Sequence, residues 1–239
     1  MTSDPLTPAG RRVIVTGARG GIGRATVEML ERLGCRVAGC DVDDFDVRDR
    51  SAVDPGMAAQ VGRLGGCDAV VANAGVVDTV HRAERFPEAE WRKDLDTNLT
   101  GQFNVVRALF EALCESGDGR VVVVSSASAE TGLPGQVAYT AAKAGLVGMV
   151  RTLAAEWGRH GIRCNAVMPG LIATPKVLAL PDAAKTAMSE ALPLGRIGEP
   201  AELAATVAFL LAPAAAYITG TVIRVDGGYG LNTASLAGR

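Results

Sequence analysis

Three side chains in the second half of the sequence are suited to acid/base chemistry on a substrate oxygen. Tyr139 and Lys143 lie four positions apart in a segment with helical spacing, which places both side chains on one face of a helix. Ser126 precedes Tyr139 by 13 positions and follows the most continuous apolar run of the chain, Arg120–Ser125. In an open α/β sheet, the carboxyl end of such a strand faces the ligand crevice.

The pKa of the tyrosine decides whether this chemistry runs near neutral pH. A free tyrosine titrates near ~10, so its pKa must fall by about 3 units, which corresponds to about 4 kcal/mol. The nearby ammonium of Lys143 in a partly dry crevice, together with the cationic nicotinamide of an oxidised dinucleotide, is able to supply an effect of that order. Ser125 and Ser128 remain alternatives to Ser126 for the serine of this group.

A glycine-rich segment, TGARGGIG at residues 16–23, lies between a β-branched run and a helical segment. Gly17, Gly21 and Gly23 lack the Cβ atoms that would keep a phosphate away from the backbone. The helix that begins behind them offers free N–H groups and the positive end of its dipole. This setting of strand, loop and helix predicts a site for a dinucleotide pyrophosphate.

Asp41 indicates which dinucleotide would bind. It follows the strand-like run Arg36–Cys40 and stands 18 positions after Gly23. A carboxylate at this place accepts hydrogen bonds from the adenosine ribose hydroxyls and repels a 2′-phosphate. Val42 adds no positive charge, whereas Arg19 in the glycine loop argues weakly for the phosphate. We predict NAD, with a water-facing aspartate at a strand end as the alternative interpretation of Asp41.

Strand-like and helix-like segments alternate along the chain and predict an α/β fold. The continuous apolar strands are typical of a parallel sheet that is buried on both faces. We expect one domain, residues 1–239: a doubly wound, three-layer αβα Rossmann fold with a flexible tail at 1–10 and a substrate lid at 171–193. The expected strands are Arg12–Thr16, Arg36–Cys40, Asp68–Asn73, Arg120–Ser125, Ile162–Val167 and Thr221–Val225. The expected helices are Ile22–Leu33, Glu88–Leu113, Tyr139–Trp157 and Pro200–Leu211.

Composition argues against several classes of protein. A net charge of -2 and an aromatic content of 4% give no reason to expect nucleic acid or an anionic membrane as partner. The sequence contains no apolar run of the ~18 residues that a membrane span needs. The five cysteines form no CxxC pair and the two histidines are isolated, so we predict neither a disulfide framework nor a metal site, and a cytoplasmic location.

In the order and spacing of its motifs, the chain resembles the short-chain dehydrogenase/reductase family, in its compact single-domain branch. The resemblance runs from Arg12 to Gly228. It rests on TGARGGIG at 16–23, ANAG at 72–75, NLTG at 98–101, Ser126, YTAAK at 139–143 and PG at 169–170. It implies an NAD-dependent oxidoreductase that transfers a hydride between the cofactor and a secondary alcohol or ketone. It also implies a homotetramer in which the segments Glu88–Leu113 and Tyr139–Trp157 form one interface.

The resemblance implies a role for individual residues. Tyr139 would be the general acid/base for the substrate oxygen, and Ser126 would hydrogen-bond that oxygen. Lys143 would hold the nicotinamide ribose and lower the pKa of Tyr139, while Asn98 would anchor a water that connects Lys143 to solvent. The other residues implied to bind the cofactor are Gly17, Arg19, Gly21, Ile22 and Gly23 in the glycine loop, Asp41, Asp46, Val47, Asn73 and Gly75 around the adenosine, and Ile172 and Thr174 at the nicotinamide carboxamide.

The segment after Asp41 departs from the family pattern. Only five positions separate Asp41 from Asp46, where relatives usually have a helix and a longer connection. We expect that helix to be missing, the third strand to be short, and the adenosine pocket to be open on one side.

The sequence does not identify the substrate. Apolar side chains of the lid either line an apolar pocket or pack against the sheet. These side chains are Leu171, Val177, Leu178, Leu180 and Met188. Two other functions stay open: an NADPH-dependent 3-oxoacyl-thioester reductase of the fatty-acid type, which the segment from Leu194 to Gly228 also resembles, and a non-catalytic sensor that binds a dinucleotide without turnover.

Overall fold

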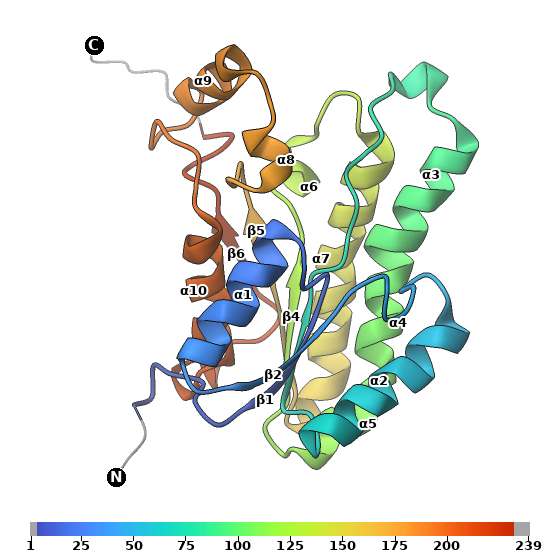
Figure 1. Cartoon of the computed structure of the whole chain (residues 1–239), viewed down its shortest axis with the longest axis vertical. Coiled ribbons are helices and arrows are strands. Elements are labelled where there is room, and N and C mark those ends of the chain that lie inside the picture. Colours follow the sequence, from blue (N-terminus) through green and yellow to red (C-terminus); the bar gives the residue numbers. More distant parts are fainter. Residues whose placement is uncertain (1–3, 232–239) are drawn as a thin grey trace.

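A parallel sheet lies at the centre of the molecule (Figure 1). The structure, a computed structural model, describes residues 4–231, and within them the sheet has six strands in the order β2-β1-β3-β4-β5-β6. Every neighbouring pair of strands is parallel, which confirms the expected doubly wound α/β fold. The strand order reverses direction between β1 and β3, and a reversal of this kind opens a ligand crevice at the carboxyl ends of the strands. The strands are β1 Arg12–Thr16, β2 Arg36–Cys40, β3 Ala69–Ala72, β4 Arg120–Val124, β5 Arg163–Pro169 and β6 Val222–Val225.

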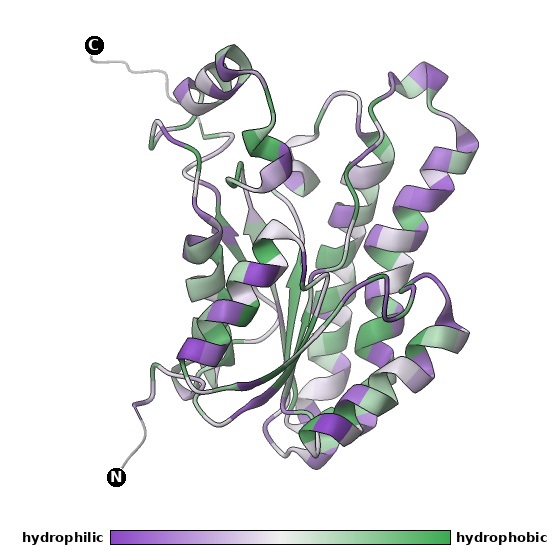
Figure 2. Ribbon diagram, in the orientation of Figure 1, coloured by the Kyte–Doolittle hydropathy of each residue, from purple (hydrophilic) through white to green (hydrophobic). Residues whose placement is uncertain are grey.

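Helices cover both faces of the sheet. One apolar core joins α2, α4, α5 and α7 to one face, and a second core joins α1 and α10 to the other. Figure 2 shows the hydrophobic strands enclosed between these two layers, as expected for parallel strands that are buried on both sides. The bounds of these helices are α1 Gly21–Arg32, α2 Arg50–Leu64, α4 Gly101–Ala108, α5 Phe110–Glu115, α7 Val137–Trp157 and α10 Pro200–Leu211. Across residues 4–231, no helix is both long and apolar enough to cross a membrane.

The connection after β2 is shorter and simpler than a further strand and helix would need. Residues 41–49, all of which the structure describes, form turns without helix or strand, so β2 is an edge strand. The predicted loss of a helix is confirmed, and the third strand is absent there rather than short. The sequence did not predict α2, whose interior contains Pro55. This helix begins after Asp49, whose carboxylate accepts a hydrogen bond from the Ser51 N–H at 2.9 Å.

The segment expected as one helix over Glu88–Leu113 is divided. It consists of α3 (Glu88–Leu95), a π-helical turn (Asp96–Thr100), α4 and α5. A π turn inside an α-helix is rare and is frequently found at functional sites. Asn98, which is fully buried, lies in this turn.

The N-terminal segment is joined to the body of the protein by backbone hydrogen bonds. In the described part of the expected flexible tail, the Gly10 N–H donates to the Gly34 carbonyl at 2.9 Å and the Pro5 carbonyl accepts from the Ala214 N–H at 2.8 Å. The start of the expected tail, residues 1–3, lies outside the described residues.

The expected lid contains two short helices, α8 (Pro175–Leu178) and α9 (Asp182–Glu190). They lie beyond the carboxyl end of β5, above the sheet in Figure 1. Leu178 and Met188 are 54% and 41% exposed, so these side chains do not pack against the sheet. The short helix α6 (Ser128–Thr131) follows β4 on the same side of the molecule.

Candidate active site

The glycine loop between β1 and α1 is shaped by close backbone contacts. Gly17 has a φ of +64°, and a Cβ there would lie 2.9 Å from the Cα of Ala74. A Cβ on Gly23 would lie 2.0 Å from the Gly17 carbonyl oxygen. Within residues 4–231 no side chain caps α1 at Gly20, so the N–H groups of its first turn stay available to an anion. The loop therefore fits a dinucleotide pyrophosphate.

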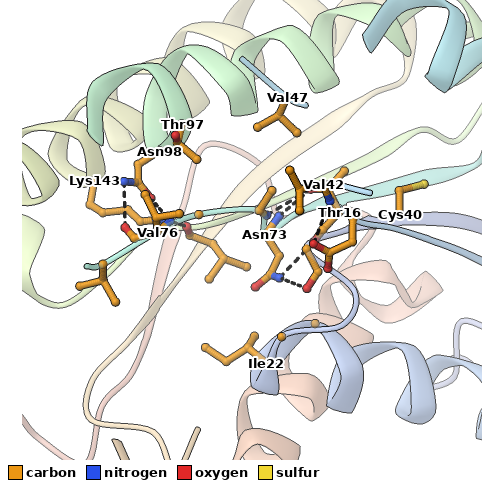
Figure 3. A pocket seen from close by; sticks show the side chains of 18 of the residues that line it. Thr16, Ile22, Cys40, Val42, Val47, Asn73, Val76, Thr97, Asn98 and Lys143 are labelled. Carbon is orange, nitrogen blue, oxygen red and sulfur yellow. Dashed lines mark hydrogen bonds between the residues drawn. The ribbon is translucent and has the colours of Figure 1, made fainter. Parts of the chain in front are cut away.

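One cavity extends from the glycine loop along the carboxyl ends of the strands (Figure 3). Most of the predicted site residues line it, whereas Arg19, Ser126 and Ile172 do not. The predicted residues in its wall are Gly17, Gly21, Ile22, Gly23, Asp41, Asp46, Val47, Asn73, Gly75, Asn98, Tyr139, Lys143 and Thr174. The residues that sequence reasoning missed include Phe45, Arg48, Val76, Val77, Lys93 and Thr97. Phe45 and Arg48 lie in the shortened segment after Asp41. The short length of this connection was the sequence feature that could have placed them at the cavity.

The Asp41 carboxylate lies in the wall of the cavity and is held by backbone groups. It accepts a hydrogen bond from the Arg19 N–H at 2.9 Å and another from the Val42 N–H at 2.9 Å. The Arg19 side chain pairs instead with the carboxylates of Asp43 and Asp44. The positive charge that argued for a 2′-phosphate is therefore balanced by two acids.

Asp46 and Val47 are also fixed by neighbouring side chains. Arg48 holds the Asp46 carboxylate with two nitrogens, Nε at 3.0 Å from Oδ1 and Nη2 at 2.6 Å from Oδ2. The hydrogen bond from Arg48 holds the pKa of Asp46 below its ordinary value. The Asn104 amide donates to the Val47 carbonyl at 3.0 Å. The Asp46 carboxylate and the Val47 backbone are thus held in place in the cavity wall that also contains Asp41.

Asn73 joins the end of β3 to the glycine loop. Its Nδ2 donates to the carbonyls of Thr16 at 3.0 Å and Gly17 at 3.1 Å, and its backbone N–H donates to the Thr16 hydroxyl at 3.2 Å (Figure 3). The side chain thereby maintains the shape of the loop that would receive the pyrophosphate.

Tyr139, Ser126 and Lys143 come together at the other end of the cavity. The Tyr139 hydroxyl is hydrogen-bonded to the Ser126 side chain. The Lys143 ammonium lies 5.7 Å from the centre of the Tyr139 ring and donates to the Val124 carbonyl at 2.9 Å.

The two serines that competed with Ser126 have other partners. The Ser125 hydroxyl donates to the Lys143 carbonyl at 2.8 Å, and the Ser128 hydroxyl lies 2.9 Å from the Ser126 hydroxyl. Ser126 is therefore the serine that reaches Tyr139.

The electrostatics of the protein's own groups differ from the prediction. Burial raises the pKa of Tyr139, and the hydrogen bond with Ser126 only partly opposes this effect. Lys143 is 4% exposed, and burial lowers its pKa to about 7. In the protein by itself the pKa of Tyr139 is therefore raised, because burial favours the neutral forms of both Tyr139 and Lys143, whereas the expected lowering concerns the site with the cationic nicotinamide bound.

Asn98 fixes the loop that follows β3 next to Lys143. Its Oδ1 accepts from the Val76 N–H and its Nδ2 donates to the Val76 carbonyl, both at 3.0 Å (Figure 3). A Cβ on Gly75 would lie 2.6 Å from this Oδ1 and 3.4 Å from the Lys143 Nζ. The site therefore has room only for glycine at this position.

The segment expected to form a lid is attached to the loop that follows β3. Lys176 of α8 forms an ion pair with Asp78, and its Nζ also donates to the Val77 carbonyl at 3.0 Å. Thr174 lines the cavity and caps α8, accepting from the Val177 N–H at 3.5 Å. Ile172 is buried beside this segment, 4% exposed.

Fold and site together define a dinucleotide-binding α/β oxidoreductase, and comparison with known proteins identifies its family. A family model described as enoyl-(acyl carrier protein) reductase matches residues 44–230. The 3-oxoacyl-(acyl-carrier-protein) reductase FabG of Vibrio cholerae serotype O1 is 35% identical over 237 residues, covering 92% of this chain and 97% of the relative. The chain belongs to the short-chain dehydrogenase/reductase family, whose members use a nicotinamide dinucleotide.

Solved structures agree with this assignment. The crystal structure of levodione reductase superposes with a TM-score of 0.87 at 35% identity, covering 92% of this chain and 97% of the other. A 3-ketoacyl-(acyl-carrier-protein) reductase from Brucella melitensis in complex with NADH has a TM-score of 0.87 at 26% identity, covering 94% of this chain and 100% of the other. The protein is an oxidoreductase of CH–OH or keto groups.

Proposed function

We propose that the protein transfers a hydride between NAD(H) and a secondary alcohol or ketone, with Tyr139 as the general acid/base. The observation that carries this proposal is that Tyr139 and Lys143 line one cavity with the glycine loop, while Ser126, outside that lining, is hydrogen-bonded to the Tyr139 hydroxyl. The bound nicotinamide would supply or accept the hydride. Gly17 and Gly23 would cradle its pyrophosphate.

The protein's own residues would handle the proton and the orientation of the substrate. In ketone reduction the Tyr139 hydroxyl donates its proton to the substrate oxygen, which Ser126 holds by a hydrogen bond. Lys143 binds the nicotinamide ribose, and its positive charge stabilises the phenolate that remains. Asn98 anchors a water through which Lys143 exchanges a proton with solvent. Ile172 and Thr174 hold the nicotinamide carboxamide.

The adenosine end supports NAD rather than NADP. The Asp41 carboxylate is fixed by two backbone N–H groups at 2.9 Å, and Arg19 is paired with Asp43 and Asp44. A 2′-phosphate would lie near the three carboxylates of this group, and their combined negative charge is larger than the single positive charge of the Arg19 guanidinium. Asp46, Val47, Asn73 and Gly75 would complete the adenosine site.

A second candidate is the reduction of a 3-oxoacyl thioester. It is favoured by the identity to FabG over nearly the full length of both chains. The name of levodione reductase favours instead a ketone that is not an acyl thioester. A sensor without turnover is disfavoured, because Ser126 is hydrogen-bonded to Tyr139 and the Lys143 ammonium lies 5.7 Å from the Tyr139 ring centre.

The proposal also covers the oligomeric state of the protein and its location in the cell. We infer a homotetramer of single-domain subunits, with α3, α4 and α7 at one interface and residues 171–193 as a lid over the substrate. All five cysteines lie within the described residues and none forms a disulfide there, which supports a reducing, cytoplasmic location. No nucleic acid or membrane is proposed as a partner.

Turnover of two substrates with two cofactors tests the proposal. We expect NADH-linked reduction of a simple ketone, of acetoacetyl-CoA or of both, with kcat/KM for NADH at least ten times that for NADPH. Asp41→Ser should raise the KM for NADH about 10-fold, because one to two charged hydrogen bonds to ribose are lost. Faster turnover with NADPH in the unmodified protein would contradict the choice of NAD.

A further inference from the structure

A second serine, Ser128, lies beside the serine that is proposed to hold the substrate oxygen. Ser126 follows β4, and Ser128 is the first residue of α6, two positions later. The Ser128 backbone N–H donates to the Ser126 Oγ at 3.2 Å, and the two hydroxyl oxygens are 2.9 Å apart. Ser128 is buried, and the reaction proposed above gives it no role.

Backbone hydrogen bonds fix the segment that carries both serines. The Ser125 N–H donates to the Val167 carbonyl of β5 at 2.9 Å. The Ala127 N–H donates to the Pro169 carbonyl, at the end of the same strand, at 2.8 Å. The backbone on each side of Ser126 is therefore tied to the neighbouring strand, so the fold itself sets the position of this hydroxyl.

The number of hydrogens in this group decides the direction of its hydrogen bonds. A serine hydroxyl has one hydrogen to donate and two lone pairs that accept. The Ser128 N–H is only able to donate, so the Ser126 Oγ accepts that bond. If the hydrogen of the Ser126 hydroxyl is directed at the substrate oxygen, the hydrogen between the two serines has to come from Ser128. Ser126 then accepts two hydrogen bonds and donates one.

We propose that Ser128 is a positioning residue, which donates to the Ser126 Oγ from its hydroxyl and its backbone N–H and so directs the Ser126 hydrogen toward the oxygens of Tyr139 and the substrate. The hydrogen bond from Ser126 lowers the pKa of Tyr139, as donation to a phenolate does. In a chain of hydroxyls, each donated hydrogen bond polarises and strengthens the next. This inference rests on the proposed roles of Ser126 and Tyr139.

Ser128→Ala removes the hydroxyl and keeps the backbone N–H. We expect kcat for NADH-linked ketone reduction to fall about fivefold, the effect of one lost hydrogen bond, while the dissociation constant of NADH stays within twofold. Because Ser126 then donates less strongly to the phenolate, the pKa of Tyr139 rises, and the increase of alcohol oxidation with pH should move to higher pH.

Thr131→Ala is the matched control for this variant. It removes from the same short helix a hydroxyl that donates to the Ala127 carbonyl at 3.2 Å, so it loosens α6 without touching the contact between the two serines. We expect it to leave the pH profile unchanged. Equal profiles of Ser128→Ala and Thr131→Ala would overturn the inference.

A double-mutant cycle separates an effect through Ser126 from a structural effect on α6. Adding Ser128→Ala to Ser126→Ala should cause no further loss of rate, measured in single turnovers because the Ser126 variant is slow. A loss by the same factor in both backgrounds would overturn the inference. If Ser126→Ala alone keeps full turnover, the proposed function fails at this residue. If it is slow while Ser128→Ala matches wild type, only this inference fails.

Discussion

At the scale of single residues, Lys143 is the group whose charge depends most on its surroundings. Its ammonium is nearly inaccessible to solvent and has the Val124 carbonyl as hydrogen-bond acceptor. Burial lowers its pKa from 10.5 to about 7, so near neutral pH the side chain changes readily between charged and neutral forms. A group of this kind is suited to passing a proton between Tyr139 and solvent.

This lowered pKa predicts how stability depends on pH. Between pH of about 7 and 10.5 the unfolded chain keeps a proton on Lys143 that the folded protein has lost, so the free energy of unfolding should rise with pH over this range. The slope from this group is at most ~1.4 kcal/mol per pH unit. Urea unfolding of cofactor-free protein at several pH values measures it. Lys143→Met should flatten the curve, and an unchanged slope in that variant would contradict the assignment.

The sequence predicts which residues meet more reliably than it predicts their charge states. Tyr139, Lys143 and Ser126 were predicted from spacing because one helix and one strand end fix their relative positions. The pKa of Tyr139 in the protein by itself is raised chiefly by burial, which the spacing of the motif does not encode. The pairing of Arg19 was also missed, because Asp43 and Asp44 come close only through the turn after β2.

At the scale of elements, the predicted strands agree with the structure to within about two residues, whereas two helices differ. Parallel strands buried on both faces give continuous apolar runs that the sequence displays directly. The helix α2 carries no such pattern, and its interior Pro55 suggests a break. The π turn at Asp96–Thr100 is set by packing of the buried Asn98 against the Val76 backbone, which no local pattern encodes.

The segment proposed as a lid, residues 171–193, is held to the body of the protein by Lys176, and we expect this attachment to affect substrate binding. Lys176 links α8 to Asp78 and to the Val77 carbonyl across the mouth of the cavity. Lys176→Ala should loosen the lid and raise the KM of the ketone severalfold, with a smaller effect on the dissociation constant of NADH. Steady-state kinetics and fluorescence titration measure the two quantities.

Lys185→Ala is the matched control for this prediction. Lys185 pairs with Asp182 and donates to the Leu178 carbonyl at 3.1 Å, so all these contacts stay inside the lid. Equal effects of the two lysine variants on KM would argue against the link between lid and body as the cause.

At the scale of the whole molecule, the sheet separates two apolar cores, and the cofactor cavity lies where the strand order reverses. Three helices on one side of the sheet also expose large apolar side chains to solvent: Trp91 on α3, Phe103 on α4 and Val137 on α7. Exposed apolar side chains on neighbouring helices indicate an interface when they form a continuous surface. We therefore expect these helices to be covered in the assembled protein.

The oligomeric state tests this expectation. Light scattering after size-exclusion chromatography should give the mass of a tetramer, and Phe103→Arg should yield smaller species, because a charge then has to be buried between subunits. Leu6→Arg, which places the same charge on an exposed position of the N-terminal segment, should keep the tetramer. A monomeric wild-type protein would contradict the proposed interface.

The proposed reaction depends above all on the phenol of Tyr139 as the proton donor. The most direct measurement compares Tyr139→Phe with wild type in NADH-linked ketone reduction, with NADH binding followed by fluorescence. We predict a fall in kcat of at least 100-fold, the magnitude of a lost general acid, with NADH affinity within about threefold of wild type. A variant that reduces the ketone at the wild-type rate would contradict the account.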